Sequence, residues 1–133
     1  MSPAAFHQRY LTDSISTASP GRLLVMLYDR LCLDLERAAA AATDGRRDAA
    51  SAALLHAQDI LLELRGSLRT DDWPAGQQLA DIYSFLLAEL MDANLRQDVE
   101  KITASLAVAE PLRDTWRQVV EAQAPAAGIG APA

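Results

Sequence analysis

The chain has 133 residues, of which half are apolar and only 5% are aromatic, and its formal net charge is −6. This length suits one domain with a buried core, and the many Ala and Leu residues favour helix because they lose little rotamer freedom there. We therefore predict an all-α fold. The negative charge argues against nucleic acid or an anionic membrane as the main partner, since both would repel the average surface.

The sequence shows no signal for membrane insertion or for disulfide bonds. No apolar run approaches the roughly 20 residues that span a bilayer, and the N-terminus lacks the apolar core and basic flank of a signal peptide. The single cysteine, Cys32, lies in an apolar run and is expected to be a small buried hydrophobe. We expect a cytoplasmic protein.

Residues 1–18 are predicted to form an N-terminal arm, either helical or extended. Phe6, Tyr10 and Leu11 stand among polar neighbours, too few apolar groups to stabilise a helix alone. One interpretation is a frayed terminus. The other is a detachable cover, in which Tyr10 and Ile15 occupy an apolar groove until a partner displaces them.

The first bundle helix is predicted to run from about Pro20 to about Thr43. Ser19 can cap it by accepting a hydrogen bond from a free amide, and Pro20 fits the first helical position. Gly45 can supply the left-handed conformation that ends many helices. Apolar residues recur at three- and four-residue steps, which predicts one buried face: Leu23, Leu24, Leu27, Tyr28, Leu31, Leu35, Ala38 and Ala42.

The second helix is predicted from about Arg46 to about Leu68, antiparallel to the first because the turn between them is short. Counting about 100° per residue, Leu55 and Leu62 fall well away from its core stripe and stack on each other. With Gln58 between them, they are either two ordinary exposed leucines or one wall of a binding groove. The predicted core stripe is Ala50, Ala53, Leu54, Ala57, Ile60, Leu61, Leu64 and Leu68.

The third helix is predicted from about Pro74 to about Leu95, after a loop that contains Trp73. Leu87 and Met91 are expected to lie to one side of its core stripe, and Met91 suits either core filling or a surface that accepts varied apolar groups. We expect Trp73 to fold back onto the bundle, with a partner contact as the alternative. The predicted core residues are Leu79, Ile82, Tyr83, Leu86, Leu90 and Ala93.

The fourth helix follows a tight connection from Asn94 to Asp98, in which either residue can cap it. Pro111 predicts a kink or a break, because proline removes a backbone hydrogen bond and clashes with the preceding turn. Trp116 would then close one end of the bundle. We expect the bundle to occupy residues 19–123 and residues 124–133 to form a disordered tail, since they have too little apolar surface to bury.

The residues do not support an enzyme. A carboxylate-bridged metal pair in such a bundle needs two Glu-x-x-His motifs, but His7 and His56 are the only histidines and neither follows a Glu by three residues. No catalytic residue, metal ligand or cofactor is predicted. The strongest alternative is a histidine phosphotransfer bundle that uses His56, but Asp59 lies one turn along and would repel the phosphoryl group.

Five segments, in order along the chain, resemble one known family. They are Ile15-x-Thr17-Ala18-Ser19-Pro20 with Leu23-Leu24-x-Met26-Leu27-Tyr28-Asp29, then Ala57-Gln58-Asp59-Ile60-Leu61-Leu62-Glu63-Leu64, Leu79-x-x-Ile82-Tyr83-x-Phe85-Leu86, Ala93-Asn94-x-x-x-Asp98, and Leu112-Arg113-Asp114-Thr115-Trp116. The chain thereby resembles the FliS family of flagellar secretion chaperones from about Tyr10 to about Glu121. It departs from the common family pattern at Trp73-Pro74-Ala75, which leaves the loop conformation open.

The resemblance implies an antiparallel four-helix bundle that binds the disordered C-terminal segment of flagellin in the cytoplasm, before export by the flagellar type III apparatus. It also favours the arm as a detachable cover. The flagellar export gate and flagellar regulators are further expected partners, and the chain is expected to be a monomer or a homodimer. The residues assigned to partner binding are Tyr10, Ile15, Leu55, Gln58, Leu62, Leu87 and Met91.

Overall fold

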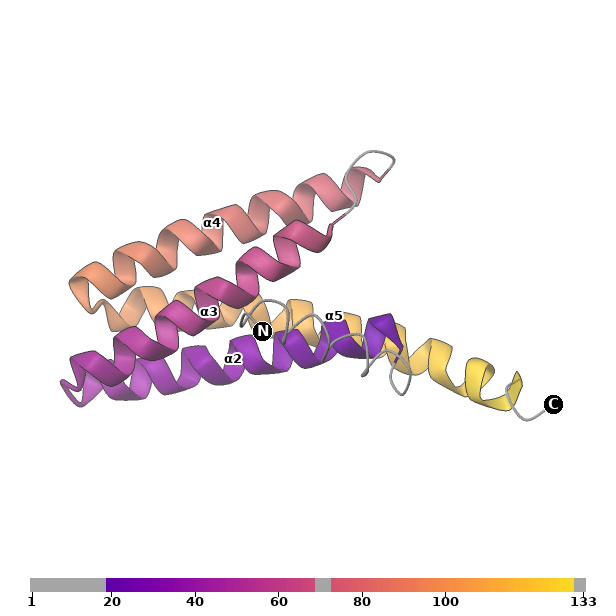
Figure 1. Cartoon of the computed structure of the whole chain (residues 1–133), viewed down its shortest axis with the longest axis horizontal. Helices are drawn as coiled ribbons and strands as arrows, with labels where there is room; N and C mark the ends of the chain where they lie inside the picture. Colours follow the sequence, from indigo (N-terminus) through magenta and orange to yellow (C-terminus); the bar gives the residue numbers. More distant parts are fainter. Residues whose placement is uncertain (1–18, 69–72, 131–133) are drawn as a thin grey trace, which may run out of the picture.

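The computed structural model describes residues 19–68 and 73–130, with side chains as far as residue 123. Its four helices are α2 (Pro20–Thr43), α3 (Arg47–Ser67), α4 (Pro74–Arg96) and α5 (Val99–Gly130). Each helix contacts two neighbours, so that α2, α3, α4 and α5 close a ring, and consecutive helices run antiparallel (Figure 1). The predicted four-helix bundle is confirmed. The arm, including Tyr10 and Ile15, lies outside the described residues.

Local signals in the sequence set the helix ends. The Ser19 hydroxyl accepts a hydrogen bond of 3.1 Å from the backbone amide of Arg22, and Pro20 opens α2 as predicted. Gly45 follows α2 with a φ of 73°, the left-handed conformation that glycine adopts without strain. The Asp98 carboxylate accepts a hydrogen bond of 3.2 Å from the Lys101 amide, which caps α5.

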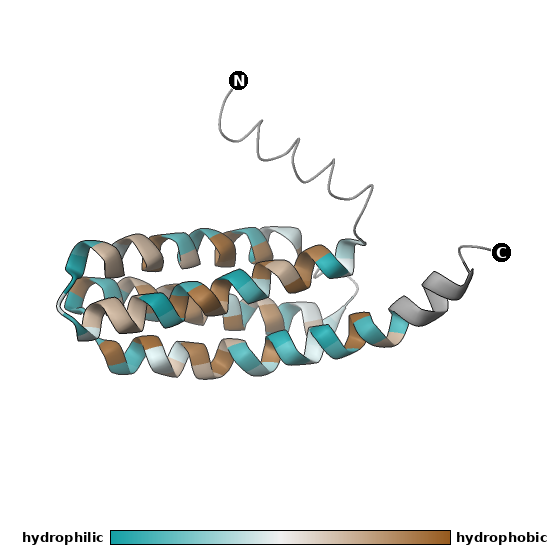
Figure 2. Cartoon of the chain, turned by 90° about the horizontal axis from the view of Figure 1, so that it is seen from below, coloured by the Kyte–Doolittle hydropathy of each residue, from teal (hydrophilic) through white to brown (hydrophobic). Residues whose placement is uncertain are grey.

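The core contains the apolar faces of all four helices, with hydrophobic and hydrophilic residues distributed around each one (Figure 2). Tyr28 of α2 and Tyr83 of α4 meet across this core, and their hydroxyls form a short hydrogen bond with each other. Because each hydroxyl is the other's partner, neither buried group loses its hydrogen bond. Most of the core stripes predicted above are buried, and Leu79, Ile82 and Leu112 pack against the core from its edge.

Helix α5 differs from the expectation in two ways. It is continuous through Pro111, which excludes the break, while the kink, the other predicted alternative, stays a prediction. Ala109 on one side and Trp116 on the other both contact the core, and this packing holds the helix together across the proline. The helix also continues to Gly130, whereas the sequence predicted a disordered tail from residue 124.

The start of α2 packs closely against α5. A Cβ atom on Gly21 would lie 2.9 Å from the Val120 side chain, too close for an ordinary contact. Farther along the same pair, Arg117 of α5 forms an ion pair with Asp29 of α2. The first turn of α2 is thus held on the bundle, and α5 extends beyond it at this end (Figure 1).

Burial changes the acidity of three core groups. Desolvation raises the pKa of Tyr28 above its ordinary value, and the hydrogen bond with Tyr83 raises it further. Desolvation also raises the pKa of Tyr83. The pKa of the Cys32 thiol is raised from 9.0 to about 11, chiefly by burial. The folded chain therefore holds these three protons more tightly than the unfolded chain.

This difference predicts a loss of stability in alkali. Groups with a raised pKa stabilise the folded state fully below their unfolded pKa, and that contribution is lost between the unfolded and the folded pKa, beginning at about 9 for the thiol and about 10 for the phenols. We expect the free energy of unfolding, measured by urea titration with circular dichroism, to fall steadily above about pH 9. Replacing both tyrosines (Tyr28→Phe with Tyr83→Phe) should make the decline shallower. An equally steep decline in that variant would contradict the assignment.

Candidate functional site

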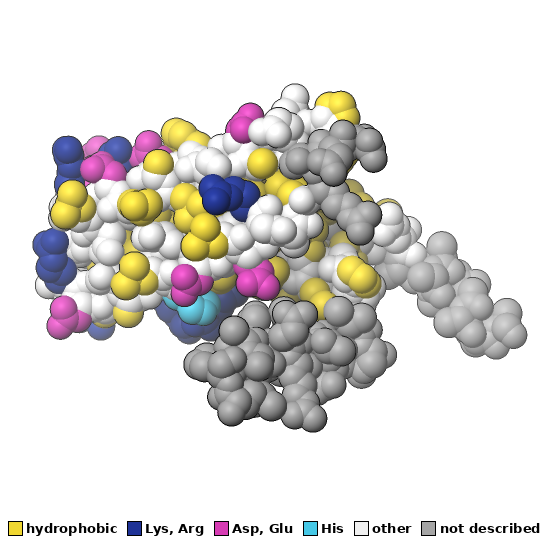
Figure 3. All heavy atoms as spheres, turned by 45° about the horizontal axis from the view of Figure 1, so that its top comes forward, with side chains coloured by type: hydrophobic (Ala, Val, Ile, Leu, Met, Phe, Trp, Pro, Cys, Tyr) yellow, Lys and Arg dark blue, Asp and Glu magenta, His cyan; other side chains and the backbone are white. Residues whose placement is uncertain are grey.

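Large apolar side chains are exposed along α3 and α4. The exposed fractions of Leu55 and Leu62 are 52% and 49%, and that of Met91 is 61%. Figure 3 shows hydrophobic side chains distributed over this face of the molecule, among a few charged ones. The sequence prediction that Leu55 and Leu62 lie off the core stripe is confirmed.

One contact shows which edges of α3 and α4 meet. The guanidinium of Arg65 donates a 3.2 Å hydrogen bond to the hydroxyl of Ser84. Seven residues make nearly two helical turns, so Gln58 shares an edge of α3 with Arg65, and Met91 shares an edge of α4 with Ser84. Because the two helices are antiparallel, residues that precede Arg65 on α3 lie beside residues that follow Ser84 on α4. Gln58 therefore lies across from Met91.

We call this region the α3–α4 surface, and define it as Leu55, Gln58, Leu62, Met91 and Leu95. Leu55 and Leu62 flank Gln58 on α3, one turn to either side. Leu95 follows Met91 by one turn on α4, and its side chain is 74% exposed. At the same end of the helix pair, Arg47 of α3 donates a 3.1 Å hydrogen bond to the Leu95 carbonyl. Four of the predicted partner-binding residues are thus brought together.

Leu87 does not belong to this surface. It is only 9% exposed and packs within the core cluster. The sequence analysis placed it to one side of α4 together with Met91, and the structure corrects this. Leu87 lies four residues after the buried Tyr83, close enough in angle to share the buried face. One further turn carries Met91 out of the core.

Two exposed apolar residues of α4 were missed by the sequence analysis. Leu95 continues the α3–α4 surface, whereas Phe85, 56% exposed, lies on the opposite edge of α4. Phe85 shares that edge with Glu89 and Asp92, which both form ion pairs with Lys101 of α5. The angular count that separated Leu55 and Leu62 from their core stripe would have found both, had it been applied to α4.

A buried carboxylate joins α2 to α3 on the other side of α3. Asp34 has a relative exposure of only 2%, and its carboxylate pairs with the Nδ1 atom of His56 and, at 3.1 Å, with the Nε atom of Arg30. Both partners are about half exposed. A buried carboxylate is costly unless it is paired in this way. Nothing in the apolar periodicity marks Asp34 as buried, because its partner is 22 residues away in the sequence.

Among residues 19–68 and 73–130, no group of three or more His, Cys, Asp or Glu side chains could hold a metal ion. No helix in this part of the chain is long and apolar enough to cross a membrane. Trp73 keeps 42% of its surface exposed at the start of α4, so it is only partly folded back onto the bundle.

A helical bundle with an exposed apolar strip is typical of proteins that act by binding other proteins. The comparisons identify the class more closely, because the family model "Flagellar protein FliS" matches residues 2–123. The chain therefore belongs to the FliS family.

Curated relatives carry the same family name. The flagellar secretion chaperone FliS of Bacillus subtilis (strain 168) is 25% identical over 114 residues, covering 86% of this chain and 85% of the relative. The flagellar secretion chaperone FliS of Escherichia coli (strain K12) is 28% identical over 116 residues, with the same coverage. A crystal structure of a bacterial flagellar chaperone superposes with a TM-score of 0.72 at 20% identity, covering 90% of this chain and 98% of that one, which supports the fold.

The difference in burial between Leu87 and Leu62 predicts a difference in how much each contributes to the free energy of unfolding. Leu87→Ala should lower the free energy of unfolding by about 2–5 kcal/mol, because it leaves a cavity in the core. Leu62→Ala, at an exposed position, should change it by no more than about 0.5 kcal/mol. Urea denaturation of both variants, followed by circular dichroism, tests this. Equal losses for the two variants would show that Leu62 is part of the core.

Proposed function

We propose that this flagellar secretion chaperone binds the disordered C-terminal segment of flagellin in the cytoplasm and prevents its polymerisation until the flagellar type III apparatus exports it. The family supplies the chaperone role, and one observation supports the binding mode. The α3–α4 surface exposes four large apolar side chains beside one another on rigid helices: Leu55, Leu62, Met91 and Leu95.

The physical mechanism is the burial of an amphipathic segment against a fixed surface. The cargo buries its apolar face on Leu55, Leu62 and Met91, while Gln58 offers an amide for its backbone. Ordering a disordered segment costs free energy, so a stable complex must bury a large area. A methionine on such a surface adapts to varied apolar partners, since its side chain is flexible and polarisable.

The N-terminal arm, residues 1–18, has a second role in the proposed mechanism, as a cover of the apolar surface. Tyr10 and Ile15 would occupy the apolar surface in the absence of cargo and would be displaced when flagellin binds. The covered state protects the surface from unwanted association, and the arm then competes with cargo. The flagellar export gate and flagellar regulators remain proposed partners, and monomer and homodimer both remain open.

The geometry does not favour the alternative of histidine phosphotransfer. His56 uses its Nδ1 atom to pair with the buried Asp34, and Asp59 and Glu63 lie in the same groove. The carboxylates of Asp59 and Glu63, which lie beside His56, would repel an incoming phosphoryl group. The family membership supports a chaperone instead.

A charge placed on the α3–α4 surface should abolish cargo binding. In the Leu55→Asp and Leu62→Asp double variant, two desolvated carboxylates would oppose an apolar partner. We expect affinity for a flagellin C-terminal peptide, measured by isothermal titration calorimetry, to fall at least about 100-fold, with helical content unchanged.

The matched control is Val108→Asp with Val119→Asp, which adds the same charge at two exposed apolar positions of α5. The control should bind as the parent chain does. An unaltered affinity in the Leu55 and Leu62 variant would remove α3 from the cargo site, and an equal loss in both variants would indicate a non-specific charge effect.

Removal of residues 1–15 tests the arm. If the arm competes for the cargo surface, the truncated chain should bind the flagellin peptide more tightly, because no covering segment has to be displaced. The same titration measures this, and Tyr10→Ala in the full chain should reproduce part of the gain. Weaker binding after truncation would show that the arm contacts the cargo directly.

A further inference from the structure

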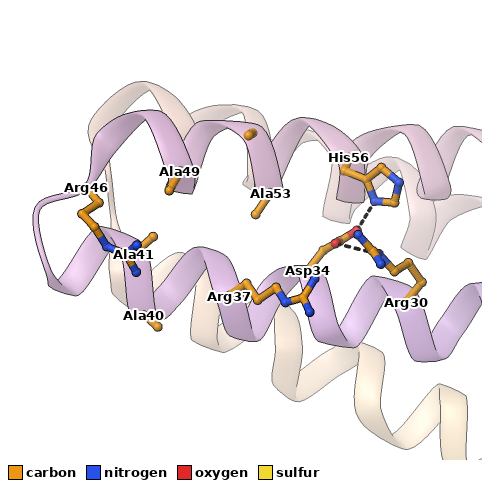
Figure 4. Close-up of a pocket in the computed structure, with 10 residues that line it drawn as sticks. Arg30, Asp34, Arg37, Ala40, Ala41, Arg46, Ala49, Ala53 and His56 are labelled. Carbon is orange, nitrogen blue, oxygen red and sulfur yellow. Dashed lines mark hydrogen bonds and ion pairs between the residues drawn. The ribbon is translucent and has the colours of Figure 1, made fainter.

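A second groove lies between α2 and α3, on the side of α3 away from the α3–α4 surface. Its volume is about 530 Å³, and small side chains form much of its wall. Figure 4 shows Ala49 and Ala53 pointing from α3 toward α2, between Arg46 at one end and the pair of Asp34 and His56 at the other. The residues that line it are Arg30, Asp34, Arg37, Ala40, Ala41, Arg46, Ala49, Ala52, Ala53 and His56.

The groove is lined by more positive than negative side chains, whereas the whole chain has a negative net charge. The protein carries a net charge of −6, yet three arginines line the groove between Arg46 and His56, and its one carboxylate there, Asp34, is paired with Arg30 and His56. Arg37 has no hydrogen-bonding or ionic partner among the described residues, and Arg46 has only Asp44 at 3.8 Å. Two guanidinium groups are thus available to an anionic partner.

The shape of the groove suits a helix. Beyond His56 the hollow continues along α3 past Leu27 and Ile60, but Asp59 and Glu63 line that part, so the acidic residues of a partner would lie between Arg46 and His56. From Arg46 to His56 the chain rises about 15 Å, enough for nearly three turns of a partner helix. Alanine side chains let a helix backbone approach closely, and an open trough of this length would leave most of a small molecule exposed.

We propose that the α2–α3 groove docks an amphipathic helix of a protein partner. Its small apolar residues lie on the alanines, and its acidic residues pair with Arg37 and Arg46. This site is separate from the α3–α4 surface, so it does not depend on the proposed flagellin binding. The arginines provide directional, charge-assisted hydrogen bonds to carboxylates. The chaperone would then carry two docking faces, one apolar and one that selects acidic helices.

A synthetic peptide tests the proposal directly. The probe is a fluorescein-labelled 18-residue helix with Ala and Leu along one face and Glu on both flanks of three successive turns only, titrated into the full chain and followed by anisotropy. A second peptide has Lys in place of every Glu. We expect the acidic peptide to bind and the basic one not to, with affinity falling as salt rises because exposed ion pairs are screened.

Two variants place the peptide in the groove. The double reversal Arg37→Glu with Arg46→Glu should weaken binding at least about tenfold by replacing attraction with repulsion. Ala49→Phe should do the same by filling the groove, and Ala49 is exposed, so the bundle should tolerate the larger ring. The control Arg22→Glu with Arg96→Glu makes the same change in net charge away from the groove and should bind as the parent chain does.

The proposal fails if the acidic peptide does not bind the parent chain, if the basic peptide binds equally well, or if the groove variants and the control lose affinity alike. The flagellin peptide, titrated into the same set, separates this proposal from the previous one. Cargo affinity that survives the arginine reversal while acidic-peptide affinity is lost assigns the two ligands to different faces.

Discussion

The hydrogen bond between Tyr28 and Tyr83 constrains the whole bundle. Both rings are fully buried, and their helices, α2 and α4, lie diagonally across the ring of four. An unpaired buried hydroxyl would cost about 1–3 kcal/mol, so α2 and α4 must keep the register in which the two hydroxyls meet. Helices α3 and α5 pack between α2 and α4, so the contacts that they make depend on the same register.

The two sides of α3 contact their neighbouring helices in different ways. Toward α4, a polar contact between Arg65 and Ser84 stands at the edge, and the larger apolar groups beside it remain exposed. Toward α2, the pair of Asp34 and His56 links the two helices, while alanines leave the surface hollow. Replacing these alanines by leucines would have filled the groove. These exposed surfaces add nothing to the stability of the bundle alone, which agrees with the binding roles proposed for them.

The sequence predicted most of the fold because its signals are local. Ser19, Pro20 and Gly45 act within one turn of the helix ends they define, and the 3.6-residue period identifies the buried stripes. What it missed depends on contacts distant in the chain. The Asp34 and His56 pair spans 22 residues, and the continuity of α5 through Pro111 comes from packing on both sides. Periodicity describes one helix at a time and contains neither fact.

The candidate site also contains residues that local signals identify and residues whose burial depends on distant contacts. Leu55 and Leu62 could be assigned because they lie about 140° from the centre of their own stripe, far beyond the uncertainty of a helical wheel. Leu87 stands near the boundary of its stripe, and whether such a residue is covered depends on how closely the neighbouring helix approaches. Its burial follows from the packing of α4 against the rest of the core. For a residue at the edge of the apolar stripe of a helix, the sequence alone therefore does not decide between the core and a binding surface. The packing of the neighbouring helix decides it.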